Sequence, residues 1–271
     1  MTKSFYRKEA TTPWYIAILR GERYTEKRPP TSKGAYLTTF LFTRRTHGQK
    51  HYKTGGFMDI HYETTWKNKL EKVSNRLREN GFEAFTATSM EELPLLLDSL
   101  MKPDSTVNAG GSMTLQETGI IDYLRKGPYT FYDRTDPSID TPEKMHALNR
   151  QAFSADYYFA SCNAITADGE IYNVDGRGNR VAATMYGPDK VILVVGRNKW
   201  VKDLDQAISR NREISAPANC VRLSRKTPCA LSGSCSDCKS VDRICNDYSL
   251  IRRSGTKGRI AVILLEWEAG Y

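Results

Sequence analysis

Short apolar runs alternate with amphipathic segments along the chain from residue 58 onward. Two of these runs, at residues 157–160 and 191–195, carry no charge and are bounded by turn residues. Uncharged runs of this length are typical of strands that are buried on both faces of a parallel sheet. Similar patterns predict further strands at residues 82–86, 106–109, 129–132, 170–174 and 260–265.

Between the apolar runs, segments with apolar residues at helical spacing follow residues that favour a helix N-cap. Ser89 and Glu92 have the spacing of a capping box, and so do Thr114 and Glu117. Because strands alternate with these segments, the sequence predicts an α/β fold with a mostly parallel sheet. Helices are predicted to begin at Thr64 or Thr65, Ser89, Thr114, Thr141, Asp203 and near Val241.

The positive charge of the chain is concentrated outside this patterned part. The 271 residues have a formal net charge of +9. Residues 1–57 hold 12 of the 40 basic residues and 3 of the 31 acidic ones, so the remainder carries 28 of each. A neutral remainder gives no reason to expect nucleic acid or a membrane surface as its partner.

Residues 1–57 also lack helix caps, amphipathic periodicity and framing turns. We interpret them as a basic N-terminal extension, either disordered or translated from upstream of a natural start at Met58. A transit peptide and a nucleic-acid-binding arm are the alternatives. Residues 58–271 are expected to form one domain with a cysteine-rich segment at 220–245. Since no stretch approaches the ~20 apolar residues of a membrane span and no secretory signal is recognisable, we expect a soluble, cytoplasmic protein.

Two stretches place glycines and polar side chains directly after predicted strands. The first supplies Gly110, Gly111, Ser112 and Thr114 at the start of a helix. A glycine turn, hydroxyl groups and free N–H groups at a helix N-terminus together favour an anion. An ordinary capped strand-to-helix turn is the alternative interpretation.

The second stretch lies between the two uncharged runs and is richer in polar residues than a turn requires. Asp168 and Gly169 are typical of a hairpin turn. Asp168 and Asp175 are candidates for a general base or ligand anchor, with Glu117 as a further base. We expect Arg180 to bind an anion, and no Ser/His/Asp triad is evident. The ligand contacts predicted from this stretch are Asn163, Thr166, Gly169, Asn179 and Arg180.

Four cysteines lie within 17 residues near the end of the chain: Cys229, Cys235, Cys238 and Cys245. Without a secretory signal, disulfides are not expected. We predict that these thiols bind a metal, either zinc or an iron–sulfur cluster, and the spacing does not decide between them. Plain reduced thiols are one alternative, and a thiol activated by neighbouring basic residues is another.

Several motifs together resemble the LUD-domain (lactate utilization) family. They are GGSMTLQETG at 110–119, the block at 155–183, VILVVGRNKWV at 191–201, APAN at 216–219 and the PC-x5-C-x2-C segment. The resemblance covers about residues 58–271 and points to the small members that consist of this domain alone. It implies a three-layer, Rossmann-like fold of the sugar-isomerase/CoA-transferase superfamily.

Members of that family are associated with operons that oxidise lactate to pyruvate alongside iron–sulfur subunits. The resemblance therefore implies a redox-linked role in 2-hydroxy-acid use. A small anion would bind between the two polar stretches, and the cysteine segment would hold the metal. Other lactate-utilization subunits and a second copy of the chain are candidate partners.

The stretch from Asn163 also resembles a loop of sugar-phosphate isomerases in which an Asp and a Cys perform the isomerisation. Val174 stands where those enzymes have Lys, so their catalytic set does not transfer directly, and Cys162 is the only thiol nearby. The alternatives are thus a phosphosugar isomerase or a CoA/acyl-transfer enzyme with structural cysteines. A non-catalytic subunit that docks a partner is a third.

Overall fold

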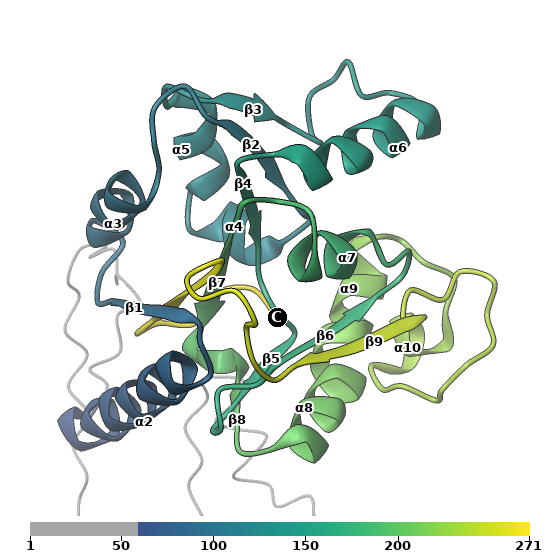
Figure 1. Ribbon diagram of the computed structural model, residues 1–271. Coiled ribbons are helices and arrows are strands. Elements are labelled where there is room, and N and C mark those ends of the chain that lie inside the picture. Colours follow the sequence, from purple (N-terminus) through teal and green to yellow (C-terminus); the bar gives the residue numbers. More distant parts are fainter. Residues whose placement is uncertain (1–58) are drawn as a thin grey trace, which may run out of the picture. The chain divides into compact units, whose positions relative to one another are not determined.

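The computed structural model describes residues 59–271, and the predictions for residues 1–57 and for a start at Met58 lie outside the described residues. Parallel strands form the larger sheet, in the order β1-β10-β7-β4-β2-β3 (Figure 1). Every predicted strand except residues 170–174 lies in it. Its strands are β1 (Glu83–Ala87), β2 (Thr106–Ala109), β3 (Thr130–Tyr132), β4 (Tyr157–Ala160), β7 (Lys190–Gly196) and β10 (Ile260–Leu265).

The helices that neighbour these strands in the sequence are α2 (Ile60–Glu79), α3 (Glu92–Leu100), α4 (Met113–Glu117), α5 (Ile120–Lys126), α6 (Pro142–Gln151) and α7 (Asn179–Met185). Alternate side chains of a strand point to opposite faces of a sheet. In β7, Val191 and Leu193 pack with α2 and α7 on one face. Ile192 and Val194 pack with α3, α4 and α5 on the other. Helices therefore cover both faces, which gives the predicted three-layer α/β architecture.

A smaller sheet has the strand order β8-β5-β6-β9. Its strands are β5 (Ala164–Thr166), β6 (Ile171–Asp175), β8 (Trp200–Val201) and β9 (Asp247–Ile251). β5 and β6 form an antiparallel hairpin, as the Asp168-Gly169 turn predicts. Beside this sheet lie α8 (Leu204–Arg210), a π-helical turn (Asn211–Ser215), α9 (Ala216–Arg222) and α10 (Pro228–Ser232) (Figure 1).

The predicted starts of three helices were wrong by a few residues. α2 begins four residues before Thr64 because the carboxylate of Asp59 accepts hydrogen bonds from N–H groups of its first turn, the shorter at 2.7 Å. α3 begins at Glu92 rather than Ser89, and the Glu92 carboxylate accepts from the N–H of Thr88 at 2.8 Å. α4 begins one residue before Thr114.

The cap of α4 is Ser112, whose extended backbone lets its hydroxyl accept from the N–H of Leu115 at 3.4 Å. The hydroxyl of Thr114 is buried and donates instead to the carbonyl of Ala269. The helix ends at Glu117, because Gly119 adopts a left-handed conformation and starts α5 as a separate helix.

No helix begins near Val241, contrary to the prediction. Residues 233–246 form an irregular loop that leads into β9. Side chains there form hydrogen bonds with backbone N–H groups. The Ser240 hydroxyl accepts from the N–H of Asp242, and the Asp242 carboxylate accepts from the N–H of Lys226. Such bonds compete with helical ones, which explains the difference.

The strands β2 and β4 lie side by side, and the chain leaves them toward opposite faces of the large sheet. After β2 it enters α4 on one face, and after β4 it passes through the β5–β6 hairpin to α7 on the other. The carboxyl ends of β2 and β4 therefore form a topological switch point, where open α/β sheets bind their ligands.

Candidate functional site

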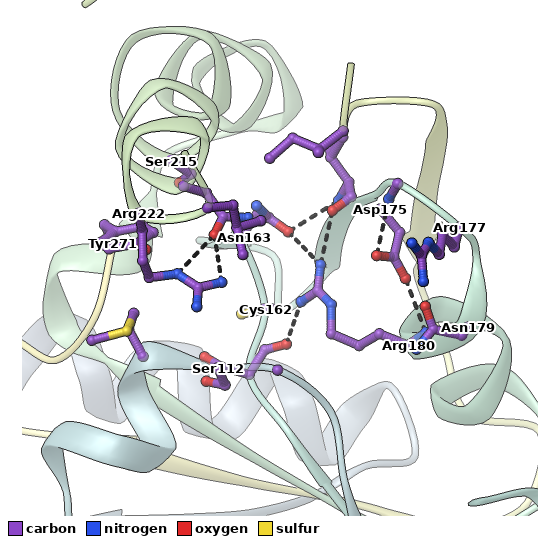
Figure 2. Close-up of a pocket in the computed structure, with 18 of the residues that line it drawn as sticks. Ser112, Cys162, Asn163, Asp175, Arg177, Asn179, Arg180, Ser215, Arg222 and Tyr271 are labelled. Atoms are coloured by element: carbon purple, nitrogen blue, oxygen red, sulfur yellow. Dashed lines mark hydrogen bonds between the residues drawn. The ribbon is translucent and has the colours of Figure 1, made fainter. Parts of the chain in front are cut away.

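A pocket of about 260 Å³ lies at this switch point (Figure 2). The loops after β2 and β4 form one side of it, the end of β6 and the start of α7 a second, and α9 with the last residue of the chain a third. The pocket-lining residues labelled in Figure 2 are Ser112, Cys162, Asn163, Asp175, Arg177, Asn179, Arg180, Ser215, Arg222 and Tyr271.

Positive charge dominates the lining of this pocket. Among residues 59–271, six basic side chains and one acidic side chain, that of Asp175, line it. Every ion pair within these residues involves other side chains, so none of the six is paired with a carboxylate. Uncompensated charge in a concave site attracts ions of the opposite sign. The basic residues are Arg134, Arg177, Arg180, Lys199, Arg222 and Arg225.

Three of the arginine side chains, those of Arg134, Arg177 and Arg225, have no hydrogen-bond partner within the described part of the chain. Arg134, from the loop after β3, packs against the backbone of the glycine turn: a Cβ on Gly111 would lie 2.8 Å from its Nη1. Burial lowers the pKa of Arg134, and the charges of Arg222 and Arg177 act in the same direction. The Nε of Arg225 is likewise buried without a partner. All three side chains could donate to a ligand without breaking a hydrogen bond within the protein.

Arg180 lines the pocket but already uses both terminal nitrogens. Its Nη1 donates to the carbonyl of Ser161 and to Asn173 Oδ1, both at 2.9 Å. Its Nη2 donates to Asn163 Oδ1 at 3.0 Å and to the carbonyl of Val174 at 2.8 Å. The acceptors are neutral, so the positive charge stays uncompensated while the geometry is fixed. The predicted direct contact of Arg180 with an anion remains a prediction.

Asp175 ends β6 and holds the start of α7. Its Oδ1 accepts from the N–H of Gly176 at 3.0 Å, and its Oδ2 accepts from the N–H groups of Arg180 and Val181 at 2.9 and 3.1 Å. A carboxylate at a helix N-terminus is stabilised by those groups and by the helix dipole. Hydrogen bonds from three backbone N–H groups thus occupy the carboxylate oxygens with which Asp175 would accept a proton as the predicted general base.

Lys199 was not predicted as a site residue, and it is the most deeply buried cation of the pocket. It is 3% exposed. Its Nζ donates to Thr114 Oγ1 at 2.7 Å and to Ser161 Oγ at 2.9 Å. Burial lowers the pKa of Lys199 to about 8, because the charged form loses its hydration.

Cys162 follows β4 and lines the same pocket, 2% exposed. Burial raises the pKa of its thiol more than the nearby Lys199, Arg210 and Arg180 lower it. The thiol is therefore protonated at neutral pH and is a weak nucleophile in this state.

The structure brings together only part of the predicted site. Gly111, Ser112, Asn163, Asp175, Asn179 and Arg180 line the pocket. Thr114 lies behind it and contacts Lys199. A Cβ on Gly110 would lie 2.6 Å from the Tyr158 hydroxyl, so this glycine allows a close approach of the pocket wall.

The remaining predicted residues lie elsewhere. Asp168 and Gly169 form the turn at the far end of the β5–β6 hairpin, where Asp168 lines a separate surface hollow with Arg76. Thr166 is buried beside them and accepts from the N–H of Glu170. Glu117 accepts from the N–H of Gly270 at 2.7 Å and is not among the lining residues.

The thiols of the cysteine segment lie near one another. Cys229 is buried, whereas Cys235, Cys238 and Cys245 are half-buried. Burial first, and then the neighbouring thiols of Cys220 and Cys235, raise the pKa of Cys245 to about 12. No three His, Cys, Asp or Glu side chains of residues 59–271 are arranged to hold a metal ion. The predicted iron–sulfur or zinc site at these four cysteines stays a prediction.

The sequence did not predict Arg134, Lys199, Arg222 and Arg225 as site residues, and from residues 175–180 it predicted Asp175, Asn179 and Arg180 but not Arg177. Of the first four, only Lys199 could have been predicted from the sequence, because it comes three residues after the buried run that forms β7. Side chains that follow such strands lie at the carboxyl end of the sheet, where ligands bind. The three arginines come from loops and from α9, and only the tertiary fold brings them to the pocket.

Comparisons with known proteins find a family model and a solved structure that are similar to this chain. The family model described as the LUD domain matches residues 70–265. A crystal structure of a DUF162 family protein from Deinococcus radiodurans is similar at 13% identity and a TM-score of 0.43, covering 74% of this chain and 97% of that one. No curated protein matches. Within residues 59–271, no helix combines the length and apolar character needed to cross a membrane. Because the family model spans most of the chain, the chain belongs to the LUD domain family, which is related to lactate utilization.

Proposed function

We propose that the chain serves lactate utilization by binding a small molecule with two or more negative charges in this pocket. The observation that supports the proposal is the charge of the lining, where six basic side chains without an ion pair accompany one acidic side chain. Phosphate groups and paired carboxylates would supply the missing negative charge, and arginine forks bind both with two parallel hydrogen bonds.

The amount of charge favours a phosphorylated metabolite or a polycarboxylate over lactate itself. Lactate carries one carboxylate and would leave most of the positive charge uncompensated. A pocket of about 260 Å³ suits a ligand of metabolite size, since larger ligands occupy sites of roughly 300–1,000 Å³.

A phosphosugar isomerase or CoA-linked enzyme would share this anion chemistry, but an isomerase of the expected type also needs a base that faces the ligand. Glu117 and Asp168 are not among the lining residues. Asp175 accepts three backbone hydrogen bonds. The arrangement therefore does not favour isomerisation by a carboxylate base.

The experiment is thermal denaturation of the full chain in a panel of anions at matched ionic strength: chloride, lactate, inorganic phosphate, pyrophosphate, ribose 5-phosphate and coenzyme A. A ligand present at a hundred times its Kd stabilises the folded state by about 2.7 kcal/mol. We expect phosphate-bearing compounds to stabilise the chain well beyond chloride and lactate.

Two variants separate the pocket from general electrostatics. Arg134→Gln removes a lining charge and should weaken the phosphate effect. Arg253→Gln removes the same charge from an exposed position outside the pocket and should leave the effect unchanged. Equal stabilisation by every salt, or an equal loss in both variants, would refute the proposal.

A redox link is a separate proposal that rests on the family resemblance and on the four thiols at Cys229, Cys235, Cys238 and Cys245. An iron–sulfur cluster there would supply electron transfer, and zinc would supply only structural support. Docking to other lactate-utilization subunits is proposed on the same ground.

A further inference from the structure

We infer that Lys199 is a reacting group, and that its amine forms an imine with the carbonyl carbon of an anionic ligand held by the pocket arginines. This inference rests on the proposed anion site, which would bring the carbonyl compound to the lysine. It assigns to that site a narrower substrate class: small anions that carry a ketone or aldehyde.

The first support is the position of the nitrogen. Lys199 follows β7 in a short helical turn and lines the pocket although it is 3% exposed. The Thr114 hydroxyl donates its own proton to the carbonyl of Ala269, so its oxygen accepts from the Lys199 Nζ at 2.7 Å. The Ser161 hydroxyl oxygen accepts a second hydrogen bond from the same nitrogen, at 2.9 Å. The remaining position on the tetrahedral nitrogen is left for a ligand in the pocket.

The second support is the absence of a counter-ion. Within residues 59–271, no carboxylate lies within ion-pair distance of this nitrogen. Burial lowers the pKa of Lys199 to about 8, and the charges of Arg210 and Arg180 also lower it, against the opposing influence of Cys162 and Glu117. At pH 7.5 such an amine is unprotonated roughly 200 times more often than an ordinary lysine.

A buried lysine near other cations has the properties of an amine nucleophile. The unprotonated Nζ would add to the carbonyl carbon, forming a C–N bond while the carbonyl oxygen takes up a proton. The C–O bond then breaks and water leaves. In sum, the ammonium form of Lys199 and the carbonyl compound give a protonated imine and one water, so no oxidant or reductant is needed.

Neighbouring groups would support this reaction without competing for it. The Cys162 thiol is buried and its raised pKa keeps it protonated, so it does not compete for the carbonyl. Arg134 and Arg225 have free donors for the phosphate or carboxylate of the ligand. The imine would then lie between the anion-binding arginines and the hydroxyl of Ser161.

The experiment traps the imine in the full chain with two probes. Pyridoxal 5′-phosphate combines a phosphate with an aldehyde, and pyruvate combines a carboxylate with a ketone. Each is added at or below the protein concentration at pH 7.5. Borohydride then supplies hydride that reduces the C=N bond to a stable amine. Peptide mapping by mass spectrometry locates the adduct.

We expect the reduced adduct at Lys199, exceeding that at exposed Lys202 by more than about tenfold. Excess inorganic phosphate should suppress the adduct formed with pyridoxal 5′-phosphate. Lys199→Arg keeps the charge but has no amine, so it should lose the adduct. Lys202→Arg is the matched control and should keep it.

Labelling spread over exposed lysines, unchanged in Lys199→Arg, would overturn the inference. The mapping on the wild-type chain decides this even if the Lys199 variant does not fold. Stabilisation by phosphate without an adduct would reject the imine and keep the proposed anion site. A lack of any phosphate effect would reject the anion site itself.

Discussion

The buried ammonium of Lys199 should make the stability of this protein depend on pH in a specific window. Its pKa falls from 10.5 to about 8 on folding. Each pKa unit corresponds to about 1.4 kcal/mol, so the ionised side chain should cost the folded state about 3 kcal/mol. Between pH 8 and 10.5 the unfolded chain binds more protons than the folded one, and stability therefore rises with pH across that window. Below pH 8 the cost is present in full.

The perturbation that isolates this effect is Lys199→Met, which keeps the aliphatic volume and removes the charge. The free energy of unfolding is measured by urea denaturation at 25 °C from pH 7 to 10.5, in chloride buffers with a thiol reductant. The value for the wild type minus that for the variant should rise by about 3 kcal/mol over the range. Nearby groups such as Cys162, Arg180, Arg210 and Glu117 are present in both proteins.

A constant difference across this range would refute the reasoning, because it would mean that Lys199 titrates alike in both states. Saturating phosphate offers a second check. A bound anion favours the ammonium form, so it should raise the pKa of Lys199 and flatten the pH dependence of the wild type. The variant should show no such change.

Three further predictions follow from the contacts. Arg180→Gln should lower the free energy of unfolding, measured by urea denaturation, by about 2–4 kcal/mol. The reason is that the side-chain oxygens of Asn163 and Asn173 and two backbone carbonyls lose their hydrogen-bond donor. If the urea midpoint stays unchanged while ligand binding is lost, Arg180 acts only on the ligand. Asp175→Ala should cost about 1–2 kcal/mol, because the N–H groups of Arg180 and Val181 in the first turn of α7 lose their acceptor, and an unchanged urea midpoint would contradict that role. If the cysteine segment binds metal, Cys235→Ser should lower the iron or zinc content of protein purified without oxygen, whereas equal contents in both proteins would reject the metal.

The sequence predicts the layers of this fold well because burial on both faces leaves an unmistakable pattern. Residues 157–160 and 191–195 lack charge and form β4 and most of β7. The pattern also predicts the edge of the sheet at which the pocket lies, since Ser112, Asn163 and Arg180 follow strands or begin helices there. Periodicity carries this information because each strand contacts helices on both sides.

The hydrophobic pattern does not predict which polar residues meet in space, because residues close in sequence can lie apart and distant ones can line the same pocket. Asp168 and Asp175 are close in sequence, but the β5–β6 hairpin separates them by the length of a strand, so only Asp175 reaches the pocket. Arg134 and Arg222 are far apart in sequence, yet they line the same pocket. An arginine in a polar loop carries no local sign of such a position.

Asn163 lies between two arginines, and this has a consequence for recognition. Its side-chain oxygen accepts from Arg180 (Figure 2), while its carbonyl oxygen accepts from Arg210. Through these hydrogen bonds, the two guanidinium groups hold the loop after β4 against β6, α7 and α8 without a ligand. A wall that is already ordered loses little conformational entropy on binding. Association at this wall should therefore be fast and selective for shape, and a ligand of the wrong geometry would be rejected rather than accommodated.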